Sequence, residues 1–259
     1  AHKLNLFIPE DAYVVMGHSR MTTQGKAKFN RNNHPFAGKV PGTKFALAHN
    51  GVLYNDHVLR QEKKLPRTNI ETDSYIAVQL IEQQGALTPA SLKTMAEAVE
   101  GSFVFTVLDE QDNFYFVKGD NPLCLLQFPS LGLYVYASTE AILRMALNDL
   151  WLNREPSKKI TVDGGEILWI TPDGARLSEH FAWEGICFSG WYFNRRGARL
   201  CVPHASRVER QYLRQLKNIA ASFGYGGEEI DAMLADGWTI DEIEEMLYDC
   251  GGEDLTCLY

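Results

Sequence analysis

The chain has 259 residues, of which 45% are hydrophobic, enough for one large globular domain or a domain with an appendage. Its net charge of −8 argues against a nucleic-acid partner, and no apolar run approaches the ~18 residues that cross a bilayer, so we expect no membrane partner. Five cysteines without regular spacing, and no visible signal peptide, favour a cytoplasmic protein with reduced thiols.

Near the N-terminus, two short apolar runs each end in polar residues. Val14–Met16 is followed by Gly17 and His18, and Phe45–Ala48 is followed by His49, Asn50 and Gly51. We interpret both runs as strands, and polar groups at the ends of two strands predict a site. Taken alone, Asn50-Gly51 is more typical of a type I′ hairpin turn, because both residues tolerate positive φ.

Other polar residues in this region have ordinary structural interpretations when taken singly. Arg20 alone is typical of a surface ion pair. Asp73 precedes a helix predicted from Ser74 to Gln84 and is typical of a helix N-cap. The histidines at positions 18, 34, 49 and 57 fit no standard zinc spacing, so we expect no metal and no cofactor.

Glycine, proline and turn residues delimit the elements that follow. Thr88-Pro89 opens a helix that Gly101 closes, and Thr139 opens another, with Met145 and Leu150 among its apolar residues. Strand pairs are predicted at 102–108 with 114–117, at 123–128 with 133–136, and at 166–170 with 176–181. Antiparallel hairpins with grouped helices favour an α+β layered fold over a parallel sheet.

The charge distribution changes after about Trp183. Residues 223–259 contain eleven Asp or Glu and no Lys or Arg, so the rest of the chain carries a net charge of +3. We predict a main domain at 1–183, a connector at 184–205 and a helical acidic appendage at 206–259. The appendage helices, at 206–223, 228–235 and 239–249, each carry an apolar stripe. We expect them to dock on each other or on the main domain, the alternative being a groove in a partner protein.

Six short motifs occur in an order that points to one family. They are GHSRMTTQG at 17–25, NNHP at 32–35, AHNGVLYN at 48–55, ETDSY at 71–75, GDNPLCL at 119–125 and AST at 137–139. Together they resemble the class II glutamine amidotransferases, the N-terminal-nucleophile amidohydrolases that include the glutaminase domain of glucosamine-6-phosphate synthase. The resemblance covers roughly residues 13–183. It implies an αββα four-layer sandwich that hydrolyses the side-chain amide of glutamine, or of a γ-glutamyl compound, to glutamate and ammonia.

The resemblance also implies a role for five residues. Arg20 matches the arginine that grips the α-carboxylate of glutamine, for which a planar two-pronged donor is well suited. Asp73 matches the acid that receives the α-ammonium group. Asn50 and Gly51 match the oxyanion hole, which combines a side-chain amide with a backbone N–H. Thr23 matches a hydroxyl beside the nucleophile.

The family's nucleophile is an N-terminal cysteine whose own α-amino group acts as the base. This sequence begins Ala1-His2-Lys3, so we expect that cysteine to lie in chain upstream of Ala1 or in a separate N-terminal fragment. Only 76 residues follow position 183, and we therefore expect any ammonia acceptor to belong to another protein. The alternative is a non-catalytic binding or scaffold protein on the same fold, which recruits a partner through its C-terminal helices.

Overall fold

The computed structural model describes most of residues 8–183 and part of the C-terminal region. The ranges are 8–9, 11–19, 25–26, 28–148 and 150–183, followed by 213–214, 216–217, 220–221, 224–236, 238, 243 and 246–247. None of the helices within these ranges is long and apolar enough to cross a membrane.

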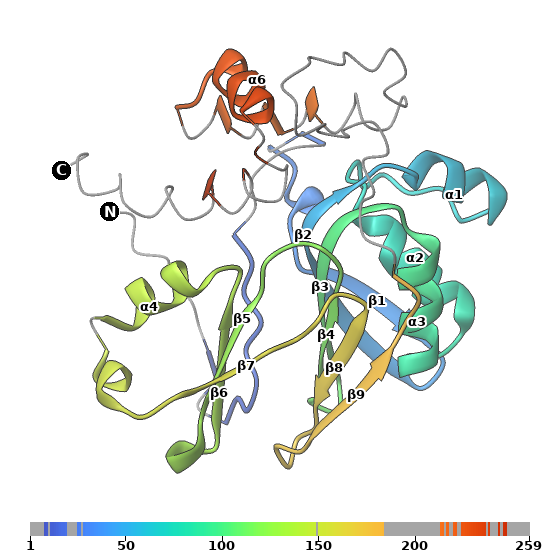
Figure 1. The fold of residues 1–259 in the computed structure, drawn as a ribbon. Coiled ribbons are helices and arrows are strands. Elements are labelled where there is room, and N and C mark those ends of the chain that lie inside the picture. Colours follow the sequence, from blue (N-terminus) through green and yellow to red (C-terminus); the bar gives the residue numbers. More distant parts are fainter. Residues whose placement is uncertain are drawn as a thin grey trace.

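Two antiparallel sheets pack face to face and are covered on their outer sides by helices (Figure 1). The larger sheet has the order β1-β2-β3-β4-β8-β9, and the smaller has the order β6-β5-β7. Helices α2 and α3 cover the larger sheet, and α4 covers the smaller one. This arrangement confirms the predicted αββα sandwich.

The bounds of the strands are β1 (Phe36–Val40), β2 (Thr43–Leu53), β3 (Gly101–Asp109), β4 (Phe114–Lys118), β5 (Cys124–Phe128), β6 (Leu133–Ala137), β7 (Lys158–Ile160), β8 (Glu166–Ile170) and β9 (Arg176–His180). The α-helices are α1 (Asp56–Glu62), α2 (Tyr75–Gln84), α3 (Pro89–Ala98), α4 (Glu140–Asn148) and α6 (Gly227–Ala235). Short 3₁₀ turns lie at η1 (Asn30–Asn32), η2 (Pro129–Leu131) and η3 (Trp151–Arg154).

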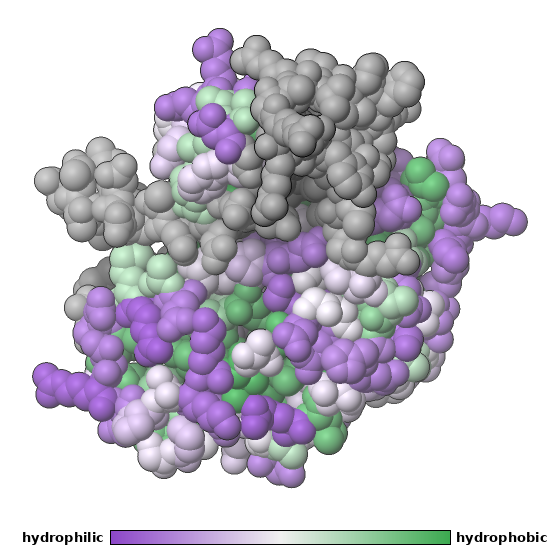
Figure 2. Space-filling model, viewed as in Figure 1, coloured by the Kyte–Doolittle hydropathy of each residue, from purple (hydrophilic) through white to green (hydrophobic). Residues whose placement is uncertain are grey.

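The alternation of side chains along each strand separates three apolar layers. Phe103, Phe105 and Val107 of β3 face α2 and α3. Between the sheets lie Phe114, Phe116 and Leu168 from the larger sheet and Leu125 and Ile160 from the smaller one. The third layer, under α4, contains Cys124, Leu126, Phe128, Leu143 and Leu147. Figure 2 shows that the face in view is largely hydrophilic, with hydrophobic residues visible mainly between the two halves of the sandwich.

Several predicted elements are confirmed. The strand pairs β3–β4, β5–β6 and β8–β9 form antiparallel hairpins, as expected. Helix α3 begins after Thr88, whose Oγ1 accepts a hydrogen bond from the Ser91 N–H at 3.2 Å, while Ser91 Oγ accepts one from the Thr88 N–H at 2.9 Å. The helix ends at Ala98, however, and Gly101 begins β3 instead of closing the helix.

Two apolar predictions near the sandwich are wrong. Val14–Met16 forms no strand: Val15 is 55% exposed, while Val14 and Met16 lie half-buried against the apolar layer between the sheets. Three apolar residues are too few to distinguish a paired strand from an extended segment that only packs. On α4 and the residues just after it, Met145 and Leu150 are exposed, because only the i, i+4 pair Leu143 and Leu147 faces the smaller sheet.

The C-terminal region packs around an apolar cluster, which we call the tail cluster. Its buried members are Leu216, Ala220, Ile230, Leu234, Ile243 and Leu247, and Tyr54 of the main domain packs against it. Figure 1 places α6 above the end of the sandwich where β2 ends. Lys217 Nζ and Asp231 form an ion pair at 2.6 Å. The expected docking is therefore seen in the described residues, whereas residues 184–212, and with them the predicted connector, lie outside those residues.

Candidate active site

Asn50 and Gly51 lie inside β2, paired with Val104 and Phe103 of β3. The interpretation as a hairpin turn is therefore wrong. Glycine tolerates a positive φ, which suits it to a turn, but here Gly51 adopts φ +139° within the strand. A Cβ at Gly51 would lie 2.0 Å from the Ser102 carbonyl oxygen and 2.9 Å from His49 Nε2, so only glycine fits this close approach between β2 and β3.

Asp73 is held against the end of the same strand. Its Oδ2 accepts a hydrogen bond from the Leu53 backbone N–H at 2.7 Å, and the residue is only 3% exposed. The N-cap interpretation is wrong, since Ser74 occupies the cap position of α2 and the Asp73 carboxylate turns toward β2. Burial raises the pKa of Asp73, opposed by its hydrogen bonds from the N–H groups of Leu53 and Ser74.

His49 lies between these two groups and was not assigned a role from the sequence. Its ring stacks on Phe105 with centroids 4.6 Å apart. Nδ1 lies 2.8 Å from Ser74 Oγ, and Nε2 lies 3.4 Å from the Ser102 carbonyl oxygen. Burial lowers the pKa of His49 to about 4, so the ring is neutral at physiological pH. One feature of the sequence could have indicated a role for His49: it is next to Asn50, and its partner Ser74 is next to Asp73.

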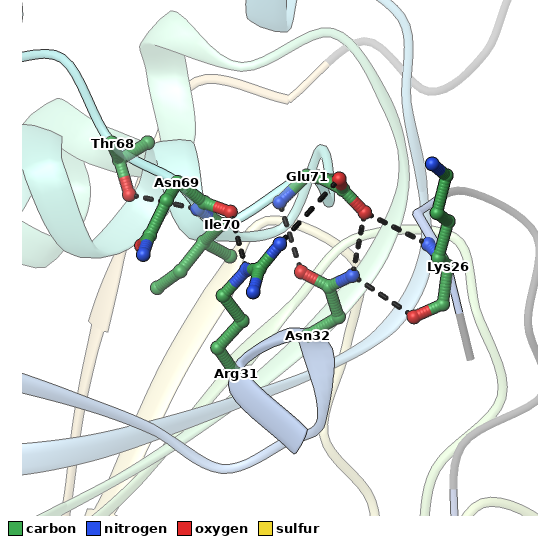
Figure 3. Close-up of polar contacts among 7 residues, drawn as sticks. All are labelled: Lys26, Arg31, Asn32, Thr68, Asn69, Ile70 and Glu71. Carbon is green, nitrogen blue, oxygen red and sulfur yellow. Dashed lines mark hydrogen bonds and ion pairs between the residues drawn. The ribbon is translucent and has the colours of Figure 1, made fainter. Parts of the chain in front are cut away.

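Outside these contacts, a group of hydrogen bonds connects the loop before β1 to the loop before α2 (Figure 3). The fully buried Asn32 donates from Nδ2 to Glu71 Oε2 at 2.9 Å and to the Lys26 carbonyl at 3.0 Å, and its Oδ1 accepts from the Glu71 N–H at 3.0 Å. Arg31 Nε donates to the Asn69 carbonyl at 2.7 Å. These contacts anchor the segment immediately before Asp73.

The structure thus brings Asn50, Gly51 and Asp73 to one place at the end of β2. Arg20 and Thr23 lie outside the described residues, although His18 on one side of them is described and its ring lies 4.3 Å from that of His34. Within the described part of the chain, no three His, Cys, Asp or Glu side chains gather as metal ligands would. The groups available are hydrogen-bond donors and a buried carboxylate, which suit a polar ligand with a cationic group.

Residues 18–144 match the family profile described as a glutamine amidotransferase domain. This matched part of the chain is a domain of the class II glutamine amidotransferase family. The chain is 30% identical over 172 residues to the glutamine–fructose-6-phosphate aminotransferase of Streptococcus mutans, covering 64% of this chain and 26% of that protein. It is 26% identical to the amidophosphoribosyltransferase of Methanothermobacter thermautotrophicus, covering 68% of this chain and 38% of that protein.

A solved structure of the glutamine phosphoribosylpyrophosphate amidotransferase of B. subtilis superimposes on this glutamine amidotransferase domain with a TM-score of 0.51 and 24% identity. The match covers 64% of this chain and 34% of that one, and it supports the fold. The chain spans between about a quarter and two-fifths of the length of these two curated relatives.

Proposed function

We propose that this glutamine amidotransferase domain hydrolyses the side-chain amide of glutamine to glutamate and ammonia. The observation that carries the proposal is the contact between Asp73 Oδ2 and the Leu53 N–H at 2.7 Å. It holds a buried carboxylate on Leu53, which lies two residues beyond Gly51 in β2. This position supports a role for Asp73 in binding the ammonium group beside the proposed oxyanion donors.

In this proposal each group has a separate task. The carboxylate of Asp73 binds the α-ammonium of glutamine, and Arg20 binds the α-carboxylate with its planar guanidinium. The Asn50 amide and the Gly51 N–H stabilise the negative oxygen that forms when the amide carbon is attacked. Thr23 places its hydroxyl beside the nucleophile. The nucleophile in this proposal is an N-terminal cysteine of the mature protein, and its own amine is the base.

The test is turnover by the complete coding sequence after removal of its initiator Met. Incubation with L-glutamine should yield equal amounts of glutamate and ammonia, and replacement of the N-terminal cysteine by alanine should abolish both products. A mature N-terminus without cysteine, or no turnover above the alanine variant, would refute the proposal.

Asn50→Asp tests the oxyanion hole directly. It retains the size of the side chain but replaces an amide donor with a carboxylate that repels the developing negative charge. Loss of one such donor typically lowers turnover by ~10²–10³. Asn153→Asp, at an exposed position on η3, is the matched control and should keep wild-type activity. Normal folding with full activity in Asn50→Asp would show that Asn50 has only a structural role.

In the non-catalytic alternative the C-terminal helices recruit a partner, and one version of it uses their apolar stripes. Ile230, Leu234 and Ile243 are instead between 0% and 4% exposed within the tail cluster. A partner that used these side chains would first have to open the cluster, which weighs against this use of the tail.

A further inference from the structure

His49 contacts both halves of the proposed glutamine site from the side that faces α2. One nitrogen of its ring reaches Ser74, the neighbour of Asp73, and the other reaches the Ser102 carbonyl, which packs against Gly51. We propose that His49 is a positioning residue that keeps the Asp73 carboxylate open to the ligand's ammonium group and fixes the backbone at Gly51. This inference rests on the proposed function and assigns the site one more residue.

The hydrogen-bond roles follow from the partners. A carbonyl oxygen only accepts, so His49 Nε2 must carry the proton that points at Ser102 O. In a neutral imidazole the other nitrogen is then an acceptor, and the Ser74 hydroxyl donates to Nδ1 across 2.8 Å. Deep burial keeps the ring neutral, in agreement with a pKa lowered to about 4.

The Ser74 hydroxyl has one proton and two acceptors within reach. Besides His49 Nδ1 at 2.8 Å, the Asp73 Oδ1 atom lies 3.5 Å from Ser74 Oγ. The shorter contact holds the proton on the His49 side. Oδ1 of Asp73 is therefore kept clear of the Ser74 hydroxyl proton, while Oδ2 accepts from the Leu53 N–H. The Ser74 backbone N–H also donates to this carboxylate, so a bound ammonium group shares it with backbone donors.

The other side of the ring acts on the oxyanion donor. Ser102 O lies so close to Gly51 that an added Cβ would be 2.0 Å away, and His49 Nε2 would be 2.9 Å from the same Cβ. A hydrogen bond that restrains this carbonyl therefore also restrains the backbone of Gly51. Small errors in the direction of an oxyanion donor weaken transition-state stabilisation more than ground-state binding.

Two substitutions separate the two contacts. Asparagine places its amide near the position of the imidazole Nδ1, and glutamine places its amide near that of Nε2. We expect His49→Asn to keep an acceptor for Ser74 but lose the Ser102 contact, so kcat should fall about tenfold with little change in KM. His49→Gln should keep the Ser102 contact but release the Ser74 proton toward Asp73 Oδ1, so KM for glutamine should rise about tenfold with little change in kcat.

A second-site change distinguishes positioning from a general loss of packing. Adding Ser74→Ala to His49→Gln removes the proton that competes for Asp73 Oδ1, and should restore most of the wild-type KM. Ser74→Ala alone should stay within about twofold of the wild-type KM. The matched controls are His57→Asn and His57→Gln, because the His57 side chain is 79% exposed on α1, and both should leave kcat and KM unchanged.

The outcomes separate this inference from the function on which it rests. A wild-type protein that does not turn over glutamine would overturn the proposed hydrolysis and this role with it. Turnover by the wild type, together with parallel changes in both His49 variants or no rescue by Ser74→Ala, would overturn only the role of His49. Nitrogen-15 NMR of labelled histidine gives a readout without catalysis: His49 should be the Nε2–H tautomer, and an Nδ1–H tautomer would contradict the proposal.

Discussion

Gly51→Ala is a small change for which the structure predicts a large loss of stability. The new methyl carbon would lie 2.0 Å from Ser102 O and 2.7 Å from the Ser102 carbonyl carbon, far inside van der Waals contact. Both atoms are backbone atoms of β3, so no side-chain rotation can relieve the clash, and β2 and β3 must separate.

The magnitude follows from two contributions. Forcing an extra methyl group into a packed interior typically costs ~1–3 kcal/mol. A positive φ at a residue with a Cβ adds about 1–2 kcal/mol. Together they lower the free energy of unfolding by about 2–5 kcal/mol, which corresponds to a fall in Tm of about 4–20 °C for a chain of this size.

Gly85→Ala is the matched control. Gly85 has φ +73° at the end of α2, and an added Cβ there would meet no atom within 4 Å. The free energy of unfolding of this variant should therefore fall only by the cost of the positive φ. Thermal unfolding followed by circular dichroism at pH 7.5 should show a clearly larger loss of Tm for Gly51→Ala. Equal losses in the two variants would contradict the close approach of β2 to β3.

Three further predictions concern the surroundings of the site and the tail. Asn32→Ala removes three hydrogen bonds of a fully buried side chain, each worth about 1 kcal/mol, and should reduce the free energy of unfolding by about 2–3 kcal/mol in urea titrations. A loss below about 0.5 kcal/mol would contradict the network. Burial lowers the pKa of His49 from 6.5 to about 4, so the unfolded chain binds more protons than the folded chain between those pH values. The free energy of unfolding of the wild type should therefore fall by up to about 3 kcal/mol as the pH drops from 6.5 to 4. His49→Gln should remove that part of the pH dependence, and an unchanged profile would show that another group causes it. Ile243→Asp puts a charge into the tail cluster and should speed amide hydrogen exchange at Leu216 and Ile230. Lys217→Ala breaks only one partly exposed ion pair and should change this exchange little. Rapid exchange at Leu216 and Ile230 in the wild type would contradict the docked tail.

Much of the sandwich could be predicted from local patterns. Alternation between turn residues identified the pairs β3–β4, β5–β6 and β8–β9, and the Thr88-Pro89 start identified α3. Local patterns did not predict β1, α1 or β7. β1 has five residues, α1 seven and β7 three, so each is too short for its hydrophobic periodicity to stand out.

The sequence by itself determined which chemical groups this protein has at its candidate site, because the order of motifs around Asn50, Gly51 and Asp73 already indicated the family. Only the tertiary structure decided how those groups are used. Asn50-Gly51 has the local preferences of a turn, and it became part of a strand because β3, about fifty residues further along, supplies the pairing partner. Asp73 has the preferences of a helix cap, and it turned to β2 because the Leu53 N–H was within its reach. Local preferences are worth about 1 kcal/mol, and burial of a whole sheet between helices and a second sheet outweighs them.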